Sequence, residues 1–154
     1  MKETVKSIDV NVPVRTAYNQ WTQFEEFPRF MSNIERVDQL DDTTLRWVAN
    51  IDGQEETWMA KITEQVPDER IAWHGEGDAP NAGVVTFHRL DEGKTRVTLQ
   101  MAYEPEGMIE SLGAALGFVD RNIQSDLENF RDMIESRGFE TGAWRGEVEQ
   151  DPTS

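Results

Sequence analysis

The stretch from Ile34 to Tyr103 constrains the fold more than any other part of the 154-residue chain, because apolar and polar residues alternate along it between regularly spaced turn residues. A period of two is typical of β-strands that bury one face. Asp52-Gly53 fits a two-residue hairpin turn, which needs positive φ at both central positions. Pro67-Asp68 fits the centre of a second turn. The pattern therefore predicts a meander of about six antiparallel strands.

The two turns also predict which side chains share a face of the sheet. The residue numbers of two positions that face each other across a hairpin add up to the same total for every such pair, and the turn sets this total. The first turn places Trp47 opposite Trp58, and the second places Ile62 opposite Trp73. Because Trp58 and Ile62 lie an even number of positions apart on one strand, all three tryptophans are predicted to face the same side.

The same arithmetic predicts the remaining pairs. The second turn places Glu64 opposite Ile71. A three-residue loop at Asp91-Glu92-Gly93 places Phe87 opposite Val97, whereas a two-residue turn would pair apolar with polar residues, so the three-residue loop is preferred. The predicted inward face comprises Leu45, Trp47, Trp58, Ile62, Ile71, Trp73, Val85, Phe87, Val97, Leu99, Met101 and Tyr103.

Helical patterns flank the predicted meander. The alternating segment Lys6–Val12 predicts a first strand, and Pro13 is well placed to begin a helix. Two short helices with a break near Pro28 are expected next. From Met108, apolar residues spaced by three or four predict one helix of roughly 25–30 residues, with Gly138 at its end. This long helix can cover the inward face, leaving either a packed core or an apolar cavity.

Composition excludes several classes of function. Thirty acidic residues against 15 basic ones give a net charge of −15, which disfavours binding to nucleic acids and to anionic membranes. The chain has no cysteine, hence no disulfide or thiolate nucleophile. It contains neither a signal-peptide pattern nor the roughly 18–20 apolar residues of a membrane helix. We therefore expect a cytoplasmic protein that is not integral to a membrane.

Candidate catalytic and metal-binding residues are few. Glu56 is predicted to face inward, where burial would raise its pKa and suit it to acid–base chemistry, unless it reaches water at the sheet rim. Tyr103 could donate a hydrogen bond to a ligand oxygen. His74 and His88 are predicted on the outward face, too far apart to share a metal. No metal site and no cofactor are expected.

The order of elements and two segments, VNVPVRTAYNQW at 10–21 and FEEFPRFM at 24–31, together resemble the START-like (birch-pollen allergen) superfamily. Within it the chain looks most like the bacterial polyketide cyclase/dehydrase and lipid-transport (SRPBCC) branch, because Val97-Thr98-Leu99 followed by residues 103–107 is similar to that branch's last strand and exit turn. The resemblance covers about residues 3–138. It implies an α+β helix-grip fold, a curved antiparallel sheet of about seven strands around a long C-terminal helix and a hydrophobic cavity.

The resemblance also implies a class of function. Members of the superfamily bind lipids, sterols, polyketides, plant hormones or quinones, and some cyclise or dehydrate polyketides. No universal catalytic residue can be carried over to this chain. We expect a domain at 1–138 that binds or transports a small hydrophobic ligand, followed by a flexible acidic tail at 139–154. The predicted ligand-binding residues are Trp47, Trp58, Trp73, Phe87, Leu99, Met101, Tyr103, Leu112, Leu116 and Val119.

Two alternatives remain at this point. The first is an enzyme of the polyketide cyclase/dehydrase type with Glu56 or Tyr103 as the acid or base. The second is a scaffold or stress-related protein with a filled core, whose acidic tail binds a protein partner.

Overall fold

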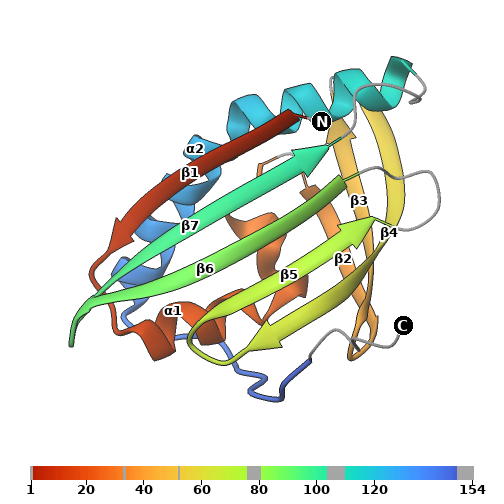
Figure 1. The fold of residues 1–154 in the computed structure, drawn as a ribbon. Helices are drawn as coiled ribbons and strands as arrows, with labels where there is room; N and C mark the ends of the chain where they lie inside the picture. The colour runs from red at the N-terminus through yellow and green to blue at the C-terminus, as the bar shows by residue number, and fades with distance from the viewer. Residues whose placement is uncertain (1, 33, 52, 76–80, 104–109, 149–154) are drawn as a thin grey trace.

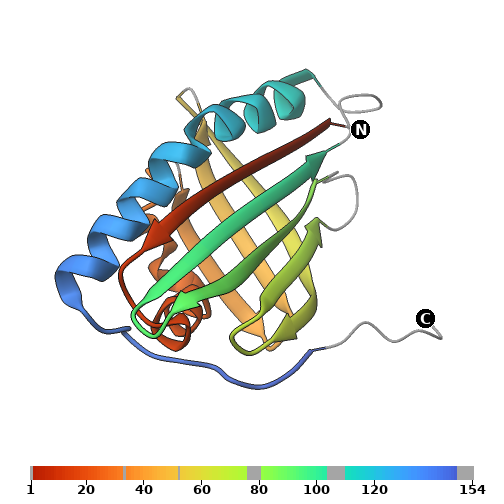
Figure 2. The same cartoon turned by 60° about the vertical axis from the view of Figure 1, so that its left-hand side comes forward.

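Seven antiparallel strands form one sheet in the order β1-β7-β6-β5-β4-β3-β2 in the computed structural model. The sheet curves around the long helix α2 (Glu110–Arg137), as Figures 1 and 2 show. The strands are β1 (Lys2–Val10), β2 (Ile34–Asp41), β3 (Thr44–Ile51), β4 (Gln54–Val66), β5 (Arg70–Gly75), β6 (Asn81–Asp91) and β7 (Lys94–Tyr103). The predicted α+β helix-grip fold with a six-strand meander is confirmed.

The structure describes residues 2–148 with four gaps. The backbone is described except at 1, 33, 52, 76–80, 104–109 and 149–154, and the side chains are also left out at 2–4, 51, 54, 81, 102–103 and 110–122. Within this part of the chain, no helix is long and apolar enough to cross a membrane.

Two short helices follow β1, as predicted, but the break between them lies elsewhere. Pro13 precedes α1 (Val14–Trp21), and Thr22 caps its C-terminal end. The 3-10 helix η1 (Phe24–Arg29) then contains Pro28 in its interior. The prediction of a break near Pro28 is therefore wrong. A short 3-10 helix has few backbone hydrogen bonds, so it accommodates a residue without an N–H.

The predicted register of the tryptophans is confirmed. Trp47 pairs with Trp58 across β3 and β4, and Ile62 pairs with Trp73 across β4 and β5. Gly53 has a φ of 86°, the left-handed conformation that the first hairpin turn requires.

The second hairpin differs from its prediction on the side nearer the turn. Glu64 pairs with Ala72 rather than with Ile71, which instead faces Gln65. The turn contains three residues, with Asp68 at a φ of 64°, and a bulge follows Ile62. The bulge inserts one extra residue into β4 and so compensates for the longer turn. It also brings the side chain of Gln65 into the core.

The third hairpin has the predicted register but a different loop. Phe87 pairs with Val97, and Asp91 pairs with Lys94, so the turn itself has only two residues. The pairing shifts by one residue between Arg89 and Asp91, so the third residue of the predicted loop lies within β6 instead.

The long helix closes the concave side of the sheet. Ile123, Leu127, Phe130 and Ile134 are buried at the spacing of one helical face. Gly138, at a φ of 77°, follows the last helical residue, as expected for a helix C-terminus. The predicted long terminal helix is thus confirmed.

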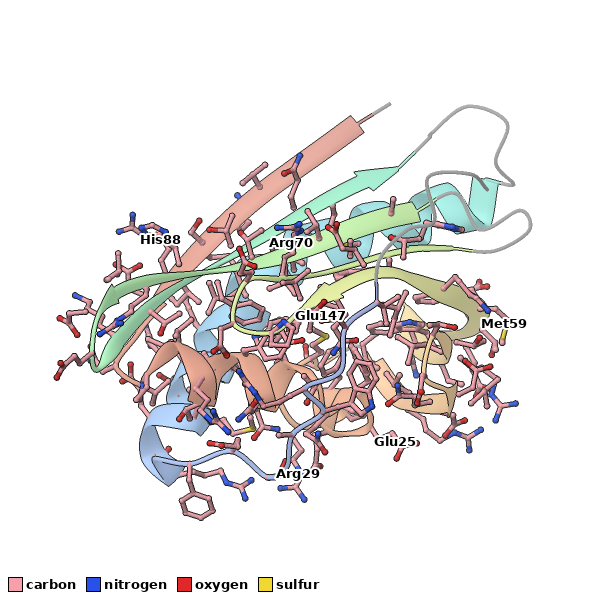
Figure 3. All side chains as sticks on the ribbon, turned by 60° about the horizontal axis from the view of Figure 1, so that its bottom comes forward. Glu25, Arg29, Met59, Arg70, His88 and Glu147 are labelled. Carbon is pink, nitrogen blue, oxygen red and sulfur yellow. The ribbon has the colours of Figure 1, made fainter. Side chains whose placement is uncertain are left out.

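After α2 the chain runs along the base of the molecule, beneath α1 (Figure 2). The amide of Gln20 donates to Thr141 Oγ1 at 3.0 Å and accepts from Thr141 N at 2.9 Å. Val148 exchanges two backbone hydrogen bonds with Gln65 on β4. Figure 3 shows Glu147 on this segment. The flexibility of the tail 139–154 stays a prediction, and residues 149–154 lie outside the described part.

Candidate ligand-binding site

A cavity lies between the concave face of the sheet, the two short helices and α2. The centre of a water molecule can occupy about 70 Å³ of this space. One water needs roughly 10–15 Å³ by this measure, so roughly five waters fit. The volume is about half of the roughly 150 Å³ of an engineered cavity that accepts one benzene ring. The described lining residues are Trp21, Phe27, Phe30, Met31, Ile34, Trp47, Trp58, Trp73, Leu99, Met101, Ile123, Asp126 and Leu127.

Three tryptophans from neighbouring strands contribute to the sheet side of the cavity. The rings of Trp47 and Trp58 lie parallel, with an interplanar angle of 3° and centroids 6.2 Å apart, as expected for cross-strand partners. The ring of Trp73 lies over Gly83, its partner on β6. A Cβ atom at position 83 would lie 2.8 Å from Trp73 Cε2, so the missing side chain makes room for this indole.

The short helices contribute the aromatic side of the cavity. Trp21 on α1 contacts Phe27 and Phe30 edge to face, with centroids 5.2 and 5.6 Å apart. Phe27 also contacts Trp47 at 5.5 Å, which joins the helical rings to the sheet. Such contacts between rings add to the stabilisation that comes from burial alone. The cavity walls are therefore held by a continuous aromatic network.

One carboxyl group lies among these apolar walls. Asp126 on α2 is 9% exposed and accepts a long hydrogen bond, 3.4 Å, from the backbone N–H of Ser32. Burial disfavours its charged form and raises its pKa from 3.8 to about 6, against the smaller opposing effect of the Ser32 N–H. This group can change its protonation near neutral pH, which is the property required of an acid or a base.

Five of the ten predicted ligand-binding residues line the cavity: Trp47, Trp58, Trp73, Leu99 and Met101. Phe87 is buried elsewhere in the core, edge to face with Tyr18 at 5.4 Å. The side chains of Tyr103, Leu112, Leu116 and Val119 lie outside the described part.

The catalytic candidate Glu56 is not among the described residues that line the cavity. It pairs with Ala49, as predicted, and its side chain is half-exposed at the end of the hairpin. His74 and His88 are exposed, and Figure 3 shows His88 pointing away from the helices. Over the described residues, no three His, Asp or Glu side chains lie close enough together to hold a metal ion.

Sequence reasoning missed the contribution of the short helices and of Asp126. The aromatic spacing at Phe24, Phe27 and Phe30 was a usable signal, because rings three positions apart on a short helix share one face. Asp126 lies between Ile123 and Phe130 on the buried face of α2. A carboxylate inside an apolar stripe is the pattern that could have identified it.

Gly83 offers a direct test of how the cavity wall is packed. Replacing Gly83 by alanine is expected to lower the free energy of unfolding by about 1–3 kcal/mol, because the added methyl group overlaps the ring of Trp73. Urea unfolding would measure the loss, and near-UV circular dichroism would report the displaced indole. Gly93→Ala is the matched control, since nothing lies within 4 Å of its added Cβ. Equal stabilities of the two variants would contradict the described packing.

Comparisons with known proteins agree with this architecture. The sequence profile of the family described as "Polyketide cyclase / dehydrase and lipid transport" matches residues 10–131. An uncharacterised 17.2 kDa protein of Streptomyces lincolnensis, from the melC2-rnhH intergenic region, is 54% identical over 149 residues, covering 96% of this chain and 99% of its own.

Solved structures show the same fold at low sequence identity. The Zhui aromatase/cyclase of Streptomyces sp. R1128 superposes with a TM-score of 0.74 at 18% identity, over 93% of this chain and 99% of the other. A START superfamily protein from Mycobacterium smegmatis gives a TM-score of 0.72 at 13% identity, over 88% and 98%. The START superfamily protein thus shares the fold. The profile match over most of the chain shows that the chain belongs to the polyketide cyclase/dehydrase and lipid-transport family.

Proposed function

We propose that the protein binds a small hydrophobic ligand in the cavity beneath α2 and acts as its carrier or sensor. The observation that supports this proposal is the composition of the cavity wall. Twelve of the thirteen described lining residues are apolar, and four of them are tryptophans. Sites for small apolar molecules combine such walls with a few polar groups that orient the ligand.

The size of the cavity limits the ligand that fits without rearrangement. Its volume of about 70 Å³ is roughly half that of a cavity that holds one benzene ring, and well below the roughly 300–1000 Å³ of sites for drug-sized molecules, so even a one-ring ligand requires small shifts of the wall. A longer lipid, quinone or polyketide would require side chains of the wall to move apart. Burial of apolar ligand surface, at roughly 25 cal/mol per Å², would supply the affinity.

Tryptophan fluorescence tests this proposal, because four of the five tryptophans line the cavity. The Trp144→Phe variant removes the fifth, which lies on the C-terminal segment, so that all emission comes from the cavity wall. Titration with p-xylene is expected to change the emission saturably. A change that grows linearly with concentration, together with no bound ligand in native mass spectrometry, would contradict the proposal.

A second candidate function, catalysis of the polyketide cyclase/dehydrase type, is favoured by Asp126. A carboxyl group with a pKa of about 6 beside a bound ligand can take up or release a proton at neutral pH. The Zhui aromatase/cyclase shares the fold. For an enzyme, Asp126→Asn would abolish turnover of a poly-β-keto substrate but leave ligand binding intact. A carrier would show no turnover with either form of the protein.

A further inference from the structure

Residues 139–148 follow α2 and lie against the short helix α1 (Figure 2). Three polar side chains of α1 and its C-terminal end are at most 2% exposed, although polar groups are seldom buried without hydrogen-bond partners. They are Asn19, Gln20 and Thr22. All three are hydrogen-bonded to the C-terminal segment, so the segment provides the partners that their burial requires.

Two of these residues are the sequence neighbours of Trp21, which lines the cavity. The Gln20 amide makes two hydrogen bonds to Thr141, at 3.0 and 2.9 Å. On the other side, Thr22 Oγ1 accepts from Trp144 N at 3.0 Å. A helix as short as α1 is not stable alone, so its position depends on what contacts it. The segment therefore helps to hold Trp21 in the cavity wall.

The same segment is also bonded to the hairpin of β4 and β5. Arg145 Nη1 donates to Asn19 Oδ1 at 2.7 Å, and its Nη2 forms an ion pair of 2.8 Å with Asp68 Oδ2 in the hairpin turn. One guanidinium group thus joins α1 to the hairpin. Val148 then exchanges backbone hydrogen bonds of 2.6 and 2.9 Å with Gln65 on β4.

The segment therefore links two walls of the cavity, since α1 carries Trp21 and the hairpin carries Trp58 and Trp73. With a volume of about 70 Å³, the cavity must widen before it accepts one ring. Buried apolar side chains hold α2, whereas residues 139–148 are all half-buried or exposed. Their contacts with α1 are chiefly hydrogen bonds, which water can replace, so this link opens more easily than the packing of α2.

We infer that residues 139–148 form a clasp between α1 and the β4–β5 hairpin, and that this clasp controls the width of the cavity and the entry of the ligand. The inference rests on the proposed binding function and concerns the regulation of the same site. A closed clasp holds Trp21 in place and keeps the cavity small. Its release lets α1 move away from the hairpin and admits a larger apolar molecule.

A disulfide that locks the clasp tests this inference in the full chain, which has no cysteine of its own. Gln65 and Val148 form an antiparallel pair with two mutual hydrogen bonds. The Cα atoms of such pairs lie roughly 5.5 Å apart, a distance that a disulfide spans. We therefore choose Gln65→Cys/Val148→Cys, with Trp144→Phe so that all emission comes from the cavity wall. Oxidation is expected to slow p-xylene association by roughly tenfold or more in stopped-flow fluorescence, and reduction to restore it.

A second variant weakens the clasp instead. Thr141→Ala/Arg145→Ala removes the side-chain bonds to α1 and to the turn. It is expected to increase the affinity for naphthalene relative to p-xylene by roughly fivefold or more, because a wider cavity favours the two-ring probe. Arg89→Ala is the matched control, since it removes the same charge from an exposed position on β6 and should leave the ratio unchanged.

Hydrogen exchange distinguishes an opening clasp from a general loss of stability and needs no ligand. In the weakened variant the backbone amide of Trp21 on α1 should exchange roughly tenfold faster than in the wild type. The amide of Phe130 on α2 should change by less than about threefold, because α2 stays packed when the clasp opens. Equal acceleration of both amides would mean that the segment only stabilises the fold, and it would overturn the inference.

The binding measurements separate the clasp from the function on which it rests. If p-xylene associates equally fast with the oxidised and the reduced protein, the clasp inference is overturned while binding in the cavity stands. An unchanged ratio of naphthalene to p-xylene affinity in the weakened variant leads to the same conclusion. If p-xylene binds neither the wild type nor any variant, the proposed function fails and the clasp inference fails with it.

Discussion

Replacing Phe130 by alanine is expected to lower the free energy of unfolding by about 3–5 kcal/mol, the usual cost of truncating a large aromatic side chain in a core. Phe130 is fully buried on α2. Its ring lies 5.2 Å from that of Phe30 and 5.3 Å from that of Trp21, so it connects the long helix to α1 and to the residue that follows η1. Truncation removes these contacts and leaves a void beside the ligand cavity.

Urea unfolding followed by tryptophan emission would measure this loss, and the melting temperature should fall by roughly 10 °C for a chain of this length. Phe139→Ala is the matched control, since Phe139 is 61% exposed just beyond the same helix. Its substitution is expected to change the stability by less than about 0.5 kcal/mol. A loss below 1 kcal/mol for Phe130→Ala would show that α2 does not pack on the short helices as described.

The fold could be predicted because turn chemistry and alternation agree along the meander. The Asp52-Gly53 turn admits one register, which places Trp47 opposite Trp58, and the structure has this pair. The prediction was wrong where a bulge intervenes. Nothing in the residues after Ile62 indicates an inserted position, because a bulge depends on how the strand must bend against its neighbours. As a result, Gln65 was not expected in the core.

The cavity was only partly predictable for a related reason. Strand alternation identified the tryptophans of the sheet, since a strand has just two faces. A helix has no such sharp division, and the width of its buried stripe depends on what packs against it. Asp126 is buried because the chain after η1 covers it, with Ser32 donating to its carboxyl group. This neighbour is 94 residues away in sequence, and no local pattern reveals it.

The buried carboxyl group of Asp126 also makes the stability of the protein depend on pH in a predictable direction. The folded state holds its proton up to about pH 6, and the unfolded chain releases it near pH 3.8. The stabilisation that the protonated carboxyl provides is therefore complete below about pH 4 and is lost as the pH rises through 6. The loss amounts to about 3 kcal/mol, because each pKa unit of difference corresponds to about 1.4 kcal/mol.

Asp126→Asn removes this dependence, because the amide has nearly the same shape and no charge. The variant is expected to be more stable than the wild type by about 3 kcal/mol at pH 8 and equally stable near pH 4, measured by urea unfolding at both values. Asp132→Asn, at an exposed position of the same helix, should not show this pH-dependent gain. An Asp126→Asn variant less stable than the wild type at pH 8 would show that the carboxylate is satisfied within the fold. A gain at pH 8 would instead mean that the chain retains a destabilising charge in its cavity, as expected where a group serves a ligand rather than the fold.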